Sequence, residues 1–196
     1  MFVIKTCIAL VGPTGSGKSR LAEAYAKAHE GVIVLSASAF IRKEMADANL
    51  TINGESIRKY AQEIMRRNGA TYWSKKMIAT AMEGSQDIET VIIDGVRNLG
   101  GISGLRSGTD KLIVIALMAE EGVRGKRIAR RGRDIDQLSS ESITELMRNE
   151  LTTSGHAWGL ELSKCIRKAD VVLNANRSFK EGYKDFAMTI ELAASR

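Results

Sequence analysis

Stretches of β-branched and other apolar residues recur along the chain and are mostly separated by longer segments with helical periodicity. They occupy residues 2–11, 32–35, 90–93, 111–118 and 170–173. Strands that are apolar throughout and alternate with helices indicate a parallel sheet covered on both faces. The pattern therefore predicts an α/β, three-layer fold around a five-stranded parallel sheet.

Apolar positions at helical spacing predict the helices between and after these strands. One helix should begin near Gly17, and Ser38 could cap the next. The other expected helices span residues 55–67, 71–83, 123–131, 140–151, 160–169 and 180–194. No repeat, linker or change in composition divides the sequence, so a single domain over residues 1–196 is expected.

Composition narrows the class of protein. Hydrophobic residues make up 44% and charged residues 27% of the 196 residues, as in ordinary soluble domains. Two cysteines and two histidines support neither a disulfide framework nor a zinc site with four ligands. The longest apolar run, 112–119, is far shorter than the ~18 residues of a membrane helix. With no signal-peptide pattern at the N-terminus, a cytoplasmic protein with no membrane partner is expected.

Positive charge is concentrated in one segment. The net charge is +6, and six lysines and arginines fall between residues 124 and 133 with no acid among them. This density suits anionic partners such as phosphates, nucleotides or nucleic acid. A solvated basic helix is the alternative. No aromatic residue is interleaved with the arginines, so a nucleic-acid partner stays open but is not favoured.

Residues 12–19, with the sequence GPTGSGKS, match the phosphate-loop pattern G-x-x-x-x-G-K-[ST]. An apolar strand precedes the motif and an amphipathic helix follows it, as the pattern requires. Successive backbone N–H groups and the helix N-terminus can bind a phosphate, Lys18 can contact the β- and γ-phosphates, and the Ser19 hydroxyl suits Mg²⁺. The expected nucleotide-binding residues of the loop are Gly12, Thr14, Gly15, Ser16, Gly17, Lys18 and Ser19.

The base-reading motif of GTPases and the signature of transporter ATPases are absent, and the length favours a compact kinase. The sequence resembles the nucleoside-monophosphate-kinase-like family, which includes adenylate-kinase-related, dephospho-CoA-kinase-like and phage deoxynucleotide kinases. The resemblance covers nearly the whole chain in motif order. It implies a P-loop NTPase fold with a small lid.

Residues 91–97, VIIDGVR, look like the family's strand followed by Asp-Gly-x-x-Arg. The resemblance implies that Asp94 holds Mg²⁺ and that Arg97 binds the acceptor's phosphate, with a turn-forming Asp and a surface Arg as the alternatives. Arg42 matches a second phosphate-binding arginine. Ala39 stands where relatives usually carry an aspartate, which leaves the acceptor class open.

The basic segment resembles a kinase lid over about residues 124–148. In this interpretation Arg127, Arg131 and Arg133 stabilise the transferred phosphoryl group, Arg127 also contacts the nucleotide, and Arg148 contributes to substrate binding. Asn174 follows the last strand and looks like part of an adenine-binding loop. An asparagine in a turn, however, needs no ligand.

The helices expected within about residues 38–84 would bind the acceptor, and Trp73 among them could stack on a substrate or pack in the core. Together these observations predict an ATP- and Mg²⁺-dependent phosphotransferase acting on a small phosphorylated acceptor, most simply a nucleoside or deoxynucleoside monophosphate. A kinase of a hydroxyl acceptor, such as dephospho-CoA or a nucleic-acid end or modified base, is one alternative. A nucleotide-switched ATPase is another. Whether the protein is a monomer or a homodimer stays open.

Overall fold

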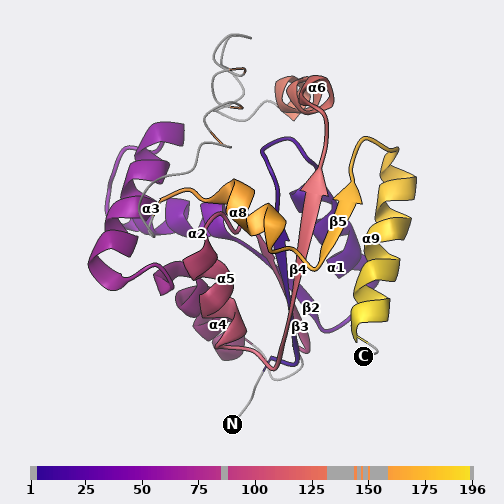
Figure 1. Ribbon diagram of the computed structural model, residues 1–196. Helices are drawn as coiled ribbons and strands as arrows, with labels where there is room; N and C mark the ends of the chain where they lie inside the picture. The colour runs from indigo at the N-terminus through magenta and orange to yellow at the C-terminus, as the bar shows by residue number, and fades with distance from the viewer. Residues whose placement is uncertain are drawn as a thin grey trace.

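The computed structural model describes residues 4–84, 88–131, 144, 147, 150 and 159–194. Within them five strands form one parallel sheet in the order β2-β3-β1-β4-β5 (Figure 1). The strands are β1 (Thr6–Val11), β2 (Val32–Ser36), β3 (Thr90–Asp94), β4 (Lys111–Met118) and β5 (Val171–Asn174). The predicted five-stranded parallel sheet is confirmed.

Strand β1 is at the centre of the sheet and is buried along its whole length. It pairs with β3 on one side, where Leu10 is opposite Asp94, and with β4 on the other, where Val11 is opposite Ala116. Because all strands run in the same direction, their carboxyl ends lie along one edge. The loops after β1, β3, β4 and β5 therefore come together there.

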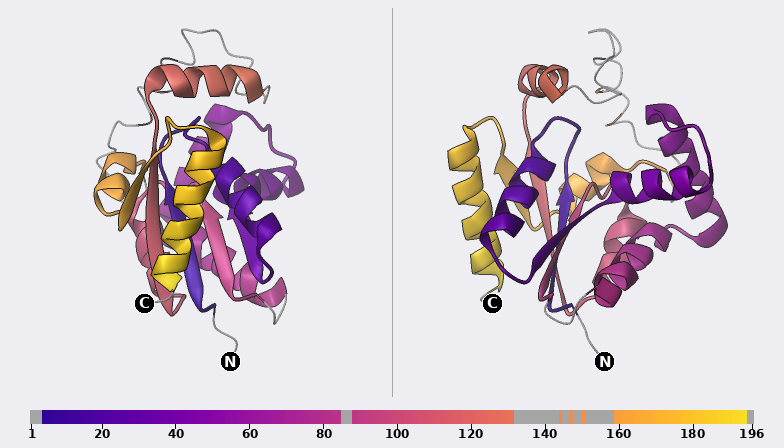
Figure 2. Two further views of the ribbon diagram at one scale, coloured as in Figure 1. Left: turned by 90° about the vertical axis from the view of Figure 1, so that its right-hand side faces the viewer. Right: turned by 180° about the vertical axis from the view of Figure 1, so that it is seen from behind.

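Helices cover both faces of the sheet (Figure 2). On one face lie α2 (Ala37–Asp47), α3 (Gly54–Asn68), α4 (Tyr72–Gly84), α5 (Leu99–Arg106) and α8 (Leu162–Arg167). On the other face lie α1 (Lys18–Ala28) and α9 (Phe179–Ala194). Helix α6 (Glu121–Arg131) follows β4 and crosses above the carboxyl edge of the sheet.

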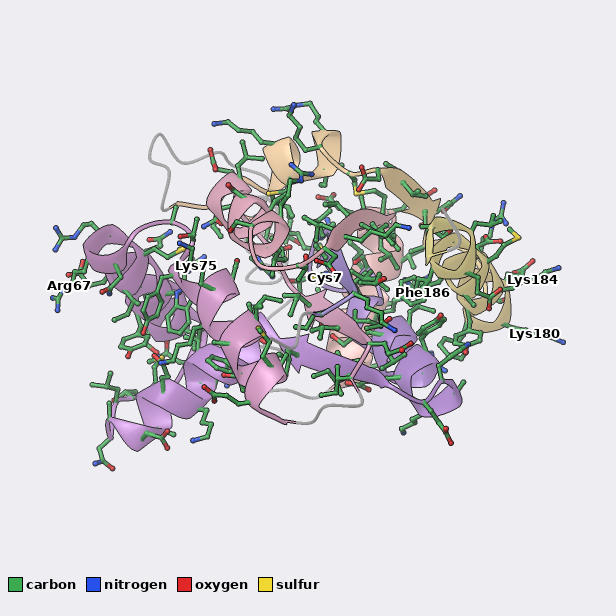
Figure 3. The ribbon with its side chains drawn as sticks, turned by 90° about the horizontal axis from the view of Figure 1, so that it is seen from below. Cys7, Arg67, Lys75, Lys180, Lys184 and Phe186 are labelled. Atoms are coloured by element: carbon green, nitrogen blue, oxygen red, sulfur yellow. The ribbon has the colours of Figure 1, made fainter. Side chains whose placement is uncertain are left out.

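The core has two layers, because successive residues of a strand point to opposite faces. From β1, Cys7 and Ala9 pack with α2–α5 and α8, whereas Ile8 and Leu10 pack with α1 and α9. Figure 3 shows Cys7 within the sheet and Phe186 turned inward from α9, while Lys180 and Lys184 of that helix point outward. Burial raises the pKa of the Cys7 thiol to about 12, so it is a packing residue and not a nucleophile.

Two local features differ from the sequence-based expectations. The cap of α2 is Ser36 and not Ser38, because the Ser36 side chain accepts from the N–H of Ala39 and the helix begins directly after β2. Helix α5 was not expected from the sequence. Its N-cap is Asn98, whose side chain accepts from the N–H of Gly101 over 2.6 Å.

None of the helices in the described part of the chain is long and apolar enough to cross a membrane.

Candidate phosphate-transfer site

The predicted phosphate loop connects β1 to α1 at the carboxyl edge of the sheet. Two glycines in it are required by their surroundings. Gly12 has φ +137°, and a Cβ there would lie 2.3 Å from the carbonyl oxygen of Leu117 in β4. Gly15 has φ +80°, and its Cβ would lie 2.8 Å from the carbonyl oxygen of Arg124 in α6. The loop is therefore packed closely between β4 and α6, as only glycine permits.

Lys18, the first residue of α1, folds back over this loop. It is only 8% exposed. Its Nζ donates hydrogen bonds to the carbonyl oxygens of Gly12 and Pro13, both at 2.8 Å, and to Ser16 Oγ at 3.2 Å. The ammonium group thus lies at the centre of the loop, where a phosphate-loop lysine meets the β- and γ-phosphates of a bound nucleotide.

Ser19 and Asp94 lie side by side because β3 is the neighbour of β1. The Ser19 hydroxyl donates to Asp94 Oδ2 over 2.5 Å. Asp94 is 6% exposed, and within the described part of the chain its second oxygen, Oδ1, is buried without a hydrogen-bond partner. A hydroxyl and a carboxylate with a free buried oxygen are oxygen donors of the kind that Mg²⁺ prefers. The residues present fit a magnesium ion.

Arg97, from the loop after β3, reaches the phosphate loop from the side of the sheet that carries β2. Its Nη2 donates to Thr14 Oγ1 over 3.2 Å, and its Nη1 forms an ion pair of 2.9 Å with Glu150. The backbone around Arg97 is held by Glu161, whose N–H donates to the Arg97 carbonyl oxygen and whose carboxylate accepts from the N–H of Leu99. The structure thus brings Arg97 against the phosphate loop, while its expected role in binding the acceptor's phosphate stays a prediction.

The Glu150 carboxylate is the partner that the sequence did not reveal. It accepts from the N–H of Thr14 over 2.9 Å and from the Thr14 hydroxyl, and Arg124 Nη1 is 3.7 Å away. Burial by itself raises the pKa of Glu150. The charge of Arg97 and the hydrogen bonds from Thr14 outweigh burial and hold the pKa below its usual value. Glu150 is therefore a buried, ionised carboxylate at the phosphate loop.

Arg124 of α6 is almost completely buried, with 2% of its surface exposed. Its Nη1 donates to the carbonyl oxygen of Thr14 over 3.2 Å, but its Nε has no hydrogen-bond partner among the described residues. In the sequence, Arg124 is distinguished only as part of the basic segment. The structure brings it directly against the phosphate loop.

Arg127 lies one turn further along α6 and spans two loops. Its Nη2 donates to the carbonyl oxygen of Ala175, after β5, over 2.8 Å, and its Nη1 is 3.5 Å from the carbonyl oxygen of Ser16. Asn174 Oδ1 accepts from the N–H of Asn176 and so stabilises the turn. The expected adenine loop is thus joined to the phosphate loop through Arg127, with Asn174 making the turn contact that the alternative interpretation described.

Several predicted site residues are found elsewhere. Trp73 is 6% exposed and belongs to the core, and its indole N–H donates to the carbonyl oxygen of Ala61 over 3.1 Å. The structure thus favours the packing interpretation of Trp73 over substrate stacking. Arg42 is half-buried on α2 and forms no hydrogen bond or ion pair with the residues described. Arg133 and Arg148 lie outside the described residues, as does the side chain of Arg131.

Taken together, a phosphate loop after the central strand, a serine–aspartate pair beside it and a five-stranded parallel sheet define a P-loop fold of the kinase-like type. The family whose description is "AAA domain" matches residues 11–144, more than half of the sequence. The chain belongs to this family.

Comparison with known proteins finds relatives of similar sequence and solved structures of the same fold. A "UPF0200/UPF0201 protein" of Archaeoglobus fulgidus is 27% identical over 175 residues, which cover 89% of this chain and 51% of that protein, so the chain spans about half the length of this relative. The structure called TT1252 from Thermus thermophilus matches with TM-score 0.64 and 14% identity over 96% and 97% of the two chains. Shikimate kinase from Bacteroides thetaiotaomicron matches with TM-score 0.60 and 14% identity over 95% and 98%.

Proposed function

We propose that this protein is a phosphotransferase that uses ATP and Mg²⁺ to phosphorylate a small acceptor. The observation that carries the proposal is the Ser19–Asp94 pair next to Lys18, with a buried Asp94 oxygen left without a partner in the described structure. Arg97 faces the same loop from the neighbouring strand. The fold shared with shikimate kinase is consistent with phosphoryl transfer to a small molecule.

In this proposal the basic side chains bind the phosphate groups, and the oxygen-bearing side chains bind the metal ion. Lys18 and the loop N–H groups would bind the β- and γ-phosphates, and Arg97 and Arg124 would neutralise charge on the phosphoryl group as it moves. Ser19 and Asp94 would hold Mg²⁺, which shields the phosphate oxygens when bound. Arg127, between the Ser16 and Ala175 carbonyls, would orient the nucleotide between the phosphate loop and the loop after β5.

We infer further that the acceptor carries a phosphate of its own, most simply a nucleoside or deoxynucleoside monophosphate. Two arginines support this. Arg42 lies on the helix that follows β2, and Arg97 follows the neighbouring β3, so both come from the same half of the carboxyl edge. Arg97 would then lie between the two phosphates and contact both the transferred phosphoryl group and the acceptor's phosphate. A guanidinium group binds a phosphate with paired hydrogen bonds. An acceptor phosphate is already an anion and needs no general base, and the Glu150 carboxylate is occupied by its own donors.

The test is ADP formation from ATP and Mg²⁺ with a panel of acceptors, followed by identification of the phosphorylated product. Nucleoside and deoxynucleoside monophosphates form one arm; dephospho-CoA, shikimate, gluconate and 5′-hydroxyl oligonucleotides form the other. Turnover with a monophosphate supports the proposal. Turnover only in the second arm assigns a hydroxyl acceptor and overturns the acceptor class, while phosphate release without transfer overturns the kinase assignment.

Lys18→Ala provides the catalytic control, and Lys27→Ala, an exposed lysine at the end of the same helix, provides the matched variant. Removing the Lys18 charge should raise the barrier by about 3–4 kcal/mol, the range for a single electrostatic group in a transition state. Lys27→Ala should turn over normally. Normal turnover of Lys18→Ala would show that the measured activity does not arise at this loop.

A further inference from the structure

The Glu150 carboxylate sits among donors that would otherwise bind an anion. Its two oxygens accept from the N–H and the hydroxyl of Thr14 and from Arg97, and Arg124 is within 3.7 Å. A backbone N–H of a phosphate loop, a hydroxyl and two guanidinium groups are the groups that bind phosphoryl oxygens elsewhere. Glu150 is 5% exposed, whereas Thr14 and the Arg97 side chain are partly exposed.

A second observation comes from Arg124. This side chain is 98% buried, from its 2% exposure, yet its Nε has no partner among the described residues. A buried guanidinium donor without an acceptor is costly, because its hydration is lost and not replaced. Glu150 therefore satisfies the Thr14 and Arg97 donors but leaves Arg124 incompletely paired. A ligand with more acceptor oxygens than a carboxylate could accept hydrogen bonds from Thr14, Arg97 and Arg124 together.

The order of the strands in the sheet indicates which end of a bound nucleotide would lie at the site around Glu150. Arg97 follows β3 and Ala175 follows β5, and these strands lie on opposite sides of β1 and its phosphate loop. Arg127 ties the loop to Ala175, on the side expected for the base. Glu150 is on the Arg97 side, where the terminal phosphate must face the acceptor. The β-phosphate, bound at Lys18, has its own donors in the loop.

We propose that Thr14, Arg97 and Arg124 form the subsite for the phosphoryl group that is transferred, and that Glu150 fills this subsite until a triphosphate displaces it. The inference rests on the proposed function. Glu150 then competes with the terminal phosphate of ATP but not with ADP. It lowers the affinity for triphosphates selectively and keeps the arginines in place between turnovers.

The experiment compares Glu150→Gln with the unaltered protein. Glutamine keeps the size and an acceptor oxygen but removes the charge that competes with phosphate. Dissociation constants for ADP and for a non-hydrolysable ATP analogue are measured by calorimetry with Mg²⁺. Glu63→Gln, a partly exposed acid on α3 that pairs with Arg66 and Arg67, is the control that changes the net charge equally.

In Glu150→Gln the affinity for the ATP analogue should rise roughly 5- to 150-fold, the usual range for energetic coupling between two sites, while the ADP affinity should change less than about twofold. Glu63→Gln should change neither. Equal effects on both nucleotides, no effect, or weaker binding of the analogue would overturn the proposal. So would unchanged binding with lost turnover, because that result identifies Glu150 as a general base.

If Glu150→Gln does not fold, as judged by its thermal unfolding, Glu150→Asp serves instead. Its shorter side chain cannot reach all the donors, so the preference for the analogue over ADP should shift in the same direction; an unchanged preference would overturn the proposal. Failure of the unaltered protein to bind either nucleotide would instead refute the proposed function. The two failures are therefore distinguishable.

Discussion

Ser19 donates a hydrogen bond to Asp94 across 2.5 Å although 75 positions separate them in the chain. The contact exists because β1, which leads into the phosphate loop before Ser19, and β3, which ends at Asp94, are neighbours in the sheet. It places a hydroxyl and a carboxylate next to the phosphate loop, where a cation would be needed to shield the phosphates of a nucleotide.

Asp94→Asn should raise the Mg²⁺ concentration needed for nucleotide binding by about 10- to 100-fold, as loss of a group that supports a metal typically does. The amide keeps the hydrogen bond from Ser19 but not the charge. Calorimetric titration of ADP at a series of Mg²⁺ concentrations measures the effect. Asp47→Asn, an exposed acid on α2 paired with Lys43, is the control. An unchanged Mg²⁺ requirement in Asp94→Asn would refute the assigned magnesium site.

Arg127 should contribute to nucleotide affinity, since it bridges the phosphate loop and the loop after β5. Arg127→Ala should weaken ADP binding by roughly tenfold, the equivalent of one charge-assisted hydrogen bond of about 1.5 kcal/mol. Arg130→Ala is the matched variant, because Arg130 is exposed on the same helix. If both variants bind ADP equally well, the contacts of Arg127 serve packing alone.

Two glycines should respond to substitution in opposite ways. Gly12→Ala should reduce stability and abolish nucleotide binding, because the new Cβ would lie 2.3 Å from the Leu117 carbonyl oxygen at a φ of +137°. Gly122→Ala, in α6, meets no atom within 4 Å and should stabilise the protein by about 0.4–1 kcal/mol. Chemical denaturation measures both. A Gly12→Ala protein as stable as the original would contradict the close contact with β4.

Acid should weaken the contribution of Glu150 to stability. Burial alone would raise the pKa of the Glu150 carboxyl. The charge of Arg97 and the hydrogen bonds from Thr14 outweigh burial and hold this pKa below the usual 4.5. A lowered pKa in the folded state means that the contribution is complete above about pH 4.5 and is lost as the pH falls through the lower folded value. The difference in unfolding free energy between the unaltered protein and Glu150→Gln should shrink below that pH. A difference that grows with acid would show the opposite shift.

The sheet and the phosphate loop could be predicted from the sequence because both are encoded locally. Apolar strands separated by helices dictate a parallel sheet, and the G-x-x-x-x-G-K-[ST] spacing dictates the loop. The expected position of Asp94 beside the loop follows from the same rule for strand ends. Strand β4 has the expected limits, and the others differ by a few residues at their ends.

Helix α5 and Glu150 could not be predicted, for different physical reasons. The sequence of α5, LGGISGLR, is rich in glycine and lacks a strong helical preference, but Gly100 is needed because a Cβ there would lie 2.4 Å from the Ala70 side chain. Glu150 lies in a polar segment with no local feature to distinguish it. Its position at the phosphate loop is evident only from its contacts in the fold, with Thr14, 136 positions away, and with Arg97.

Helix α6 rests on the phosphate loop with almost no clearance, since a single added carbon at Gly15 would collide with the Arg124 carbonyl oxygen. A movement of the loop toward the helix would therefore displace the helix as well. Binding of a nucleotide in the loop would shift α6 and change the surroundings of its outer surface, where Ala129 is exposed. A dye coupled at that position would sense occupancy without touching the nucleotide.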